Sequence, residues 1–170
     1  MSTKILIFGF IGLVALLLIG DRVLNSNGQA SVGGGVSQQR ESPNFSLSAL
    51  DGSTIVLADY QGDKPVILDF FATWCPNCRR DMPKLNRFYE EYKDEVEVIG
   101  VNLRENKSIV QEYIRKAGID FPIVMDPSGQ IAQAFRIQYT NTHILIDKNG
   151  TIVRVIPGDI RESDIVSLIQ

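Results

Sequence analysis

Two cysteines, Cys75 and Cys78, are the residues whose type and spacing most clearly predict chemistry. They are separated by Pro76 and Asn77, and this Cys-x-x-Cys pattern follows an apolar run and opens a predicted helix. That context is typical of a redox-active pair. The free N–H groups and partial positive charge of a helix N-terminus stabilise a thiolate on the first cysteine. We therefore predict thiol-disulfide exchange, with Cys75 exposed and attacking, and Cys78 resolving the mixed disulfide.

Three other interpretations of the cysteine pair are open. A zinc half-site would need two further ligands, and His143 is the only histidine in the chain. A structural disulfide would close a loop too small to stabilise the fold much. The third interpretation is two unrelated core cysteines. The sequence favours the redox pair, and it suggests no metal and no cofactor.

Two aspartates, Asp69 and Asp81, are candidates for proton transfer. Asp69 interrupts an apolar run, where burial should raise its pKa and let it accept a proton from Cys78. Asp81 follows Cys78 by one helical turn, and a carboxylate there disfavours a neighbouring thiolate. The alternatives are a structural acid at Asp69 and a solvated helix residue at Asp81. His143 is interpreted as a packed or half-exposed strand residue, with a minor role near the cysteines as the alternative.

The pattern of apolar and polar residues predicts the elements that position these side chains. A short hairpin is expected around the Asp51-Gly52 turn. The strands expected after it are 65–71, 96–101, 123–125, 144–147 and 151–156. The expected helices are 76–92 (kinked at Pro83), 108–116, 129–135 and one starting near Asp159 or Arg161. This order predicts an α/β fold with a central mixed sheet and helices on both faces.

The N-terminal residues predict attachment to a membrane. Residues 5–20 are apolar and uncharged, and a spanning helix needs about 20 such residues. We interpret residues 1–24 as a retained anchor or uncleaved signal, and Lys4 favours a cytoplasmic N-terminus. A signal cleaved near Gly28 and Ala30, and a buried helix, are the alternatives.

The remaining sequence divides into a linker and one domain. Residues 25–42 are rich in glycine and serine and lack a periodic apolar pattern, which predicts a flexible linker. The folded domain is then expected at residues 43–170. The chain has 170 residues, 44% of them apolar, which is enough for one packed domain. Its formal net charge of −3 argues against a nucleic-acid partner.

Residues 66–83, VILDFFATWCPNCRRDMP, resemble the active-site region of thioredoxin-like proteins, in particular the membrane-anchored TlpA/ResA-type thiol-disulfide oxidoreductases. The similarity continues through residues 96–102, 121–126 and 144–150, and so covers essentially the whole domain. It implies a thioredoxin-like fold on the extracytoplasmic side of a single-pass cell-membrane protein, expected to be a monomer. It also implies reduction of disulfides in client proteins, such as apocytochrome c, with electrons from a membrane thiol-disulfide donor.

The resemblance also implies a role for each matching residue. Cys75 matches the nucleophilic cysteine of the family and Cys78 the resolving one. Asp69 matches the buried acid of thioredoxins, and Asp81 an acidic position near the cysteine pair. Pro83 matches the proline that kinks the helix.

One position departs from the family pattern. The family places a cis-proline where this chain has Asn141, in a loop that faces the cysteines and pairs with the client backbone. A cis bond before a non-proline residue costs about 2.5–4 kcal/mol, so the Thr140–Asn141 bond is either cis and strained or trans in a different loop. The residues expected to contact the client are Trp74, Pro76, Asn77, Thr140, Asn141 and Thr142.

Three further functions are alternatives to a reductase. The first is a disulfide oxidase or isomerase on the same scaffold. The second is a thiol peroxidase, which needs a Thr-x-x-Cys turn, whereas Thr73 lies only two residues before Cys75. The third is a non-catalytic thioredoxin-fold binding or chaperone module, which the unusual Asn141 motivates.

Overall fold

The computed structural model describes residues 40–170 of the chain. The predicted anchor (residues 1–24) lies outside this part, as does the predicted linker up to residue 39. Among the described residues, no helix has the length and apolar character needed to cross a membrane.

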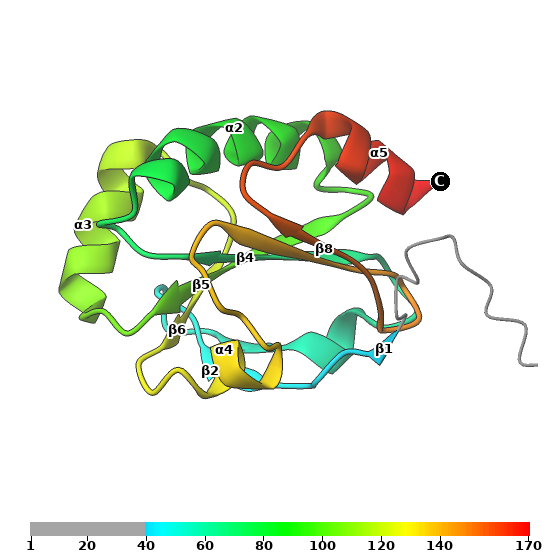
Figure 1. The fold of residues 1–170 in the computed structure, drawn as a ribbon, viewed down its shortest axis with the longest axis horizontal. Helices are drawn as coiled ribbons and strands as arrows, with labels where there is room; N and C mark the ends of the chain where they lie inside the picture. The colour runs from blue at the N-terminus through cyan, green and yellow to red at the C-terminus, as the bar shows by residue number, and fades with distance from the viewer. Residues whose placement is uncertain (1–39) are drawn as a thin grey trace, which may run out of the picture. The chain divides into compact units, whose positions relative to one another are not determined.

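A six-stranded mixed sheet forms the centre of the described domain (Figure 1). Its parallel part is formed by the neighbours β4, β5 and β6, and the remaining pairs are antiparallel. The strands, in their order across the sheet, are β1 (Arg40–Glu41), β8 (Thr151–Pro157), β7 (Thr142–Ile146), β4 (Val66–Phe71), β5 (Glu97–Leu103) and β6 (Ile123–Asp126). The predicted mixed sheet is therefore confirmed.

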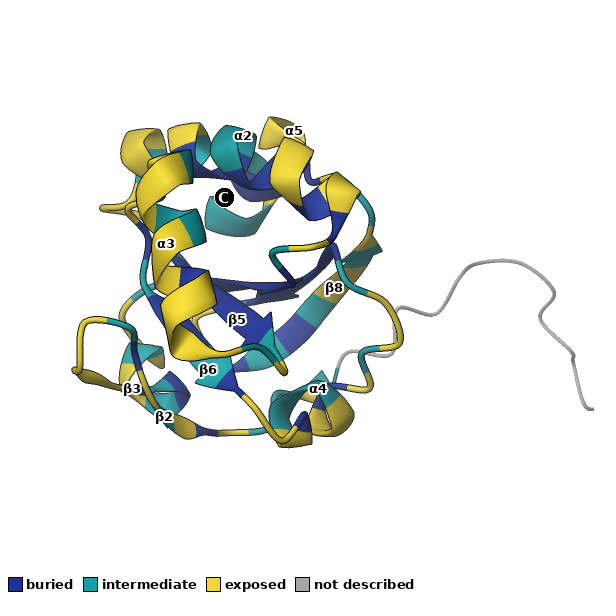
Figure 2. Cartoon of the chain, turned by 90° about the vertical axis from the view of Figure 1, so that its left-hand side faces the viewer, coloured by how far each residue is buried: buried dark blue, intermediate teal, exposed yellow. Residues whose placement is uncertain are grey.

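Both faces of the sheet are covered, as predicted (Figures 1 and 2). One apolar core lies under the helices α2 (Pro76–Tyr92), α3 (Lys107–Ala117) and α5 (Glu162–Ile169). A second core lies under α4 (Gln130–Ala134), the 3₁₀ turn η2 (Leu57–Tyr60) and the hairpin of β2 (Ser46–Ser48) and β3 (Thr54–Val56). The predicted N-terminal hairpin is thus a separate two-stranded sheet that helps to cover the second face.

The central strand β4 places Asp69 on the face that α2 covers. Every residue of β4 is buried, because helices or the hairpin lie over both faces. Side chains alternate along a strand, and Ile67 and Phe71 belong to the core under α2, whereas Leu68 and Phe70 belong to the other. Asp69 therefore points toward α2, between two apolar neighbours.

Several element boundaries differ from the sequence prediction. Residues 40–41 form β1 on the edge of β8, so the sheet begins inside the segment interpreted as linker. Strand β5 extends to Leu103, and α3 begins after Asn106. At the opposite edge, Ala49 makes an isolated antiparallel bridge to Val124 of β6. Helix α2 has the predicted bounds, with Pro83 inside it.

Candidate active site

Cys75 and Cys78 form a disulfide at the N-terminus of α2, with their Cα atoms 5.4 Å apart. Cys75 is the N-cap in an extended conformation, and Pro76 occupies the first turn, where its missing N–H costs no helix hydrogen bond. The Cys78 N–H donates to Cys75 Sγ at 3.2 Å. The N–H groups at the start of α2 thus point toward the Cys75 sulfur, and they stabilise a thiolate there when the disulfide is reduced.

The two cysteines differ in accessibility. Cys75 is 5% exposed and Cys78 is 0% exposed, so the prediction of an exposed Cys75 is wrong for the disulfide form. Burial follows because both residues pack into the core under α2. Of the pair, only Cys75 retains accessible surface, and the side chain of Trp74 beside it is largely exposed. An incoming thiol or disulfide therefore meets Cys75 first.

Glu105 holds the turn that leads into Cys75, a role that the sequence analysis missed. Its carboxylate accepts the N–H of Thr73 at 2.7 Å and the Thr73 hydroxyl at 2.6 Å. It also accepts the side-chain amide of Asn102 at 2.8 Å. Because β4 and β5 are parallel neighbours, the segments after their C-terminal ends meet at one sheet edge. The sequence feature that could have predicted this role is the acidic Glu105 shortly after the end of β5.

Asp69 and Asp81 are brought together by His143. Nε2 of His143 lies 3.5 Å from Asp69 Oδ1 and 3.4 Å from Asp81 Oδ2. All three side chains are only 1% exposed. The solvated-helix interpretation of Asp81 is therefore wrong, and His143 is a fully packed residue. Its contact with the two carboxylates joins β4, β7 and α2 at a point one turn from Cys78.

Burial changes the proton affinity of both carboxylates. Loss of water raises the pKa of Asp69 to about 6; the nearby His143 opposes this and Asp81 adds to it. Burial also raises the pKa of Asp81, while the N–H that Ile160 donates to it opposes the rise. The sequence predicted the direction for Asp69. Asp69 is thus suited to exchange a proton near neutral pH, and Asp81 binds its proton more tightly than an ordinary aspartate does.

Asn141 occupies the predicted cis-proline position in a left-handed conformation, with φ 58°. No peptide bond among residues 40–170 is cis, so the Thr140–Asn141 bond is trans and the loop differs from the family pattern. The Asn141 N–H donates to the Phe70 carbonyl at 2.9 Å, and its own carbonyl accepts the Gly158 N–H at 2.7 Å. The backbone is thereby fixed on both sides without a proline.

A chain of polar side chains links this loop to the cysteine motif. Asn141 Nδ2 donates to Asp159 Oδ1 at 3.2 Å, and Arg80 donates to the same oxygen at 2.8 Å. Arg80 also donates to Asn77 Oδ1 at 3.0 Å. Asn77 lies between the two cysteines, so the network reaches from the loop to the motif itself. The sequence analysis did not assign Asp159 to the site.

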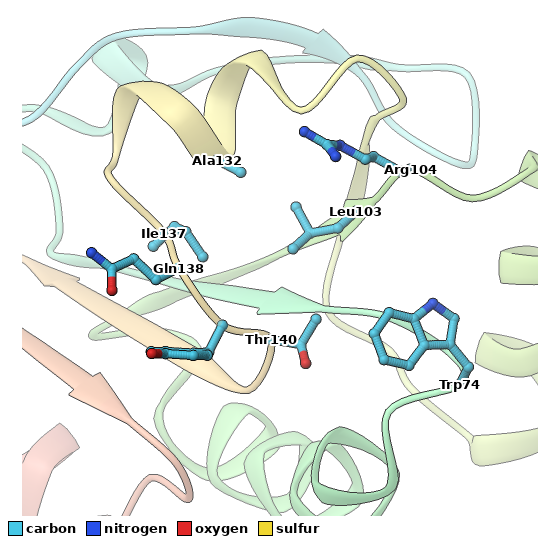
Figure 3. Close-up of a pocket in the computed structure, with 8 residues that line it drawn as sticks. Trp74, Leu103, Arg104, Ala132, Ile137, Gln138 and Thr140 are labelled. Carbon is cyan, nitrogen blue, oxygen red and sulfur yellow. The ribbon is translucent and has the colours of Figure 1, made fainter.

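A pocket of about 570 Å³ lies beside Trp74, the residue that precedes Cys75 (Figure 3). Trp74 forms one side of it, and the 137–140 segment forms the other. Its lining residues are Trp74, Leu103, Arg104, Ala132, Ile137, Gln138, Tyr139 and Thr140. Trp74 and Tyr139 are 68% and 71% exposed, an unusual exposure for aromatic side chains. The pocket thus combines apolar and polar side chains next to Trp74, the neighbour of Cys75 in the chain.

Of the six predicted client-contact residues, Pro76 and Asn77 are exposed between the cysteines. The other four fall into two groups. Trp74 and Thr140 line the pocket. Asn141 and Thr142 are buried, and the Thr142 hydroxyl donates to the Tyr139 carbonyl at 2.9 Å. The side chains of Asn141 and Thr142 therefore stabilise the conformation of the loop and do not face the pocket.

Comparisons with known proteins agree with this site. The profile described as the AhpC/TSA family matches residues 39–155. The thiol-disulfide oxidoreductase ResA of Geobacillus thermodenitrificans is 41% identical over 124 residues, covering 72% of this chain and 71% of that protein. ResA of Bacillus subtilis is 34% identical over 139 residues, covering 79% and 77%. A crystal structure of a thiol:disulfide interchange protein of the thioredoxin family from Chlorobium tepidum superposes with a TM-score of 0.70 at 27% identity, covering 78% and 95%.

The sheet, the helix-capping Cys-x-x-Cys disulfide and the buried carboxylates define a thioredoxin-like thiol-disulfide oxidoreductase. The chain belongs to the AhpC/TSA family, and its named relatives are the ResA thiol-disulfide oxidoreductases. The resemblance that the cysteine motif suggested is thereby confirmed.

Proposed function

We propose that this protein reduces disulfides in client proteins on the extracytoplasmic side of the cell membrane, held there by residues 1–24. The observation that carries the proposal is the Cys75–Cys78 disulfide at the N-terminus of α2. The pocket lined by Trp74 and Tyr139 begins one residue before Cys75 in the chain. The apolar run of residues 5–20 supports the location. Client proteins such as apocytochrome c, and a membrane thiol-disulfide donor, follow from the family resemblance.

The first step uses Cys75. Its thiolate attacks one sulfur of a client disulfide, forming a mixed disulfide and expelling the other client sulfur as a thiolate. The N–H of Cys78, which already contacts this sulfur, and the helix N-terminus stabilise the thiolate before attack. The attacking residue is Cys75 because it is the only cysteine of the pair with accessible surface.

The second step uses Cys78. Its thiol loses a proton to the buried carboxylates, and the resulting thiolate attacks the Cys75 sulfur. The Cys75–Cys78 disulfide forms and the client leaves as a thiolate, so two electrons have passed from the protein to the client. A carboxyl group whose pKa is raised toward neutrality is suited to accept this proton, which favours Asp69.

Client binding is assigned to the pocket between Trp74 and the 137–140 segment. An apolar or aromatic client residue near the client cysteine fits its rim of Trp74 and Tyr139. The buried Asn141 holds the loop in place through its backbone bonds and Asp159.

The reduction potential tests the direction of electron flow. Trp74 is the only tryptophan and adjoins Cys75, so its fluorescence reports on the disulfide. The purified full chain, kept in mild detergent, is equilibrated in graded thiol-disulfide buffers. A potential well below about −210 mV is expected for a reductase, whereas one near −120 mV would make the protein an oxidase.

Insulin-disulfide reduction tests catalysis itself. The wild-type chain is expected to turn over insulin, while Cys75→Ser abolishes turnover and Cys78→Ser accumulates a mixed disulfide. A wild-type protein that cycles between redox states without reducing insulin would instead indicate a binding module.

A further inference from the structure

Asp69, His143 and Asp81 form one continuous buried cluster beside the start of α2. The pairing of β4 with β7 sets Asp69 directly opposite His143. Asp81 follows Cys78 by one turn of α2, so its side chain lies on the same helix face as the resolving cysteine. A single imidazole nitrogen thereby lies within 3.5 Å of two carboxylates that come from different elements.

The two carboxylates differ in their route to solvent. Among residues 40–170, no donor forms a hydrogen bond with either oxygen of Asp69. Asp81 Oδ1 lies 3.5 Å from Nζ of Lys84, whose side chain is 36% exposed. A proton held on Asp69 thus has His143 as its next acceptor. Asp81, although itself buried, contacts the partly exposed Lys84 and so forms the surface end of the cluster.

We propose that the His143 imidazole connects Asp69 to Asp81 as a proton relay, so that the proton released by Cys78 moves from Asp69 at the buried end of the cluster to Asp81 at its surface end. This inference rests on the proposed function, in which Cys78 must lose a proton to resolve the mixed disulfide. Proton transfer from Cys78 to Asp69 is reversible, so without the imidazole the proton returns to Cys78 more often and the resolving thiolate forms more slowly.

The proton balance of one cycle is complete. Cys78 gives its proton to the Asp69 carboxylate, and the Cys78 thiolate forms the intramolecular disulfide while the client thiolate leaves. Asp69 passes the proton to Nε2 of His143, and Nε2 passes it to the Asp81 carboxylate. Water beside Lys84 removes it, and the released client thiolate takes a proton from water. The cluster thereby returns to its starting protonation state, and its three side chains neither gain nor lose electrons.

Neighbouring groups contribute to the pH response of the cluster. Strand β8 sets the uncharged Ile156 opposite His143. Besides burial, the charge of Asp159 raises the pKa of Asp81, and Lys84 lowers it. The titratable or charged groups around the cluster are Arg80 and Lys84 on α2, Tyr113 on α3 and Asp159 before α5.

The resolving step can be isolated with dithiobis(nitrobenzoate), whose thiolate product is coloured. The reduced full chain releases one product when Cys75 attacks and a second when Cys78 resolves the mixed disulfide. His143→Gln keeps a polar side chain but cannot carry the proton. We expect it to slow the second phase by about tenfold near pH 7 and to alter the pH profile of that phase. The first phase, which does not use the cluster, serves as the internal reference.

Two further variants make the test independent of folding defects at position 143. Asp81→Asn blocks the surface end and is expected to slow the second phase by a similar factor. The double variant should be no slower than the slower single variant, because both changes interrupt one route. Ile144→Val, a buried change on the opposite face of β7, controls for packing and should leave both phases unchanged.

The outcomes separate the two proposals. A second phase with unaltered rate and pH profile in both His143→Gln and Asp81→Asn would overturn the relay. The relay would also be overturned if the double variant slowed the second phase by the combined factor of the two single variants. If the wild type releases only one product, Cys78 does not resolve the mixed disulfide, and the proposed function fails together with the relay.

Discussion

The side-chain amide of Asn141 donates to Asp159 Oδ1 at 3.2 Å, in the loop where thioredoxin-like relatives are expected to carry a cis-proline. The backbone of Asn141 adds a bond to the Phe70 carbonyl and accepts one from Gly158. Hydrogen bonds in this protein thus hold a loop conformation that differs from the one a cis-proline would impose.

Restoring the family's proline should therefore destabilise this protein. Asn141→Pro removes the N–H that Phe70 accepts, and its ring is incompatible with the observed φ of 58°. We expect a loss of at least about 2 kcal/mol in the free energy of unfolding, measured with urea on the oxidised protein. Asn141→Gly tolerates the left-handed backbone and should lose less than about 1 kcal/mol. A proline variant as stable as the wild type would contradict this account of the loop.

The buried Asp69 should make stability depend on pH. Because burial raises its pKa from 3.8 to about 6, the ionised form is costly in the folded state. The stabilising contribution of the protonated form is complete below about pH 4 and is lost as pH rises through about 6. Asp69→Asn should therefore be more stable than wild type at pH 8, by up to about 3 kcal/mol, and the gain should disappear near pH 4. Urea titrations across this range measure it.

A matched control for the pH effect is Asp63→Asn, which changes an exposed aspartate. Its stability difference should stay within about 0.5 kcal/mol at every pH. If the stability difference of Asp69→Asn is equally independent of pH, then burial does not raise the pKa of Asp69 in the folded protein.

Trp74 should contribute to client binding and little to stability. Its side chain is largely exposed and forms one side of the pocket. Trp74→Ala is expected to raise KM for insulin by about fivefold to tenfold, while the rate with a small disulfide changes less than about twofold. Ile109→Ala removes another exposed apolar side chain that does not line the pocket, and should change neither value. Equal loss of rate with both substrates would place Trp74 in the chemical step instead.

Glu105 should fix the turn before the cysteines. Glu105→Ala removes the acceptors of the Thr73 N–H, the Thr73 hydroxyl and the Asn102 amide. We expect a loss of about 1–3 kcal/mol of stability, together with slower attack by Cys75, measured by stopped-flow exchange. Glu95→Ala, at an exposed glutamate, is the control and should be neutral. Unchanged kinetics in a destabilised Glu105→Ala would limit Glu105 to a structural role.

The sequence predicted the local features of the site well. The apolar run that forms β4, the helix start at Pro76 and the redox pair all depend on residues close together in the chain. The contact of His143 with Asp69 and Asp81 was not predicted, because it depends on strand register and on the placement of α2 over the sheet. A lone histidine in a strand carries no local signal of such a contact.

The loop at Asn141 shows a second limit of sequence reasoning. The missing proline was visible, but both isomers of the Thr140–Asn141 bond were open. The trans bond follows from contacts with Phe70, Gly158 and Asp159, which are distant in sequence or lie on other elements. Those partners become neighbours only in the folded chain.

The short pairings at the two edges of the sheet have a consequence for any unfolded chain that meets the domain. β1 covers the start of β8, Arg154 adds charge further along that margin, and Pro157 ends it without an N–H. At the other margin, the Ala49 bridge occupies β6. An unfolded chain can add a strand to a free sheet edge, and in the described domain the free edge of β8 is limited to residues 153–157, which include Arg154 and Pro157. The edges of this sheet are therefore a poor template for the assembly of unfolded chains.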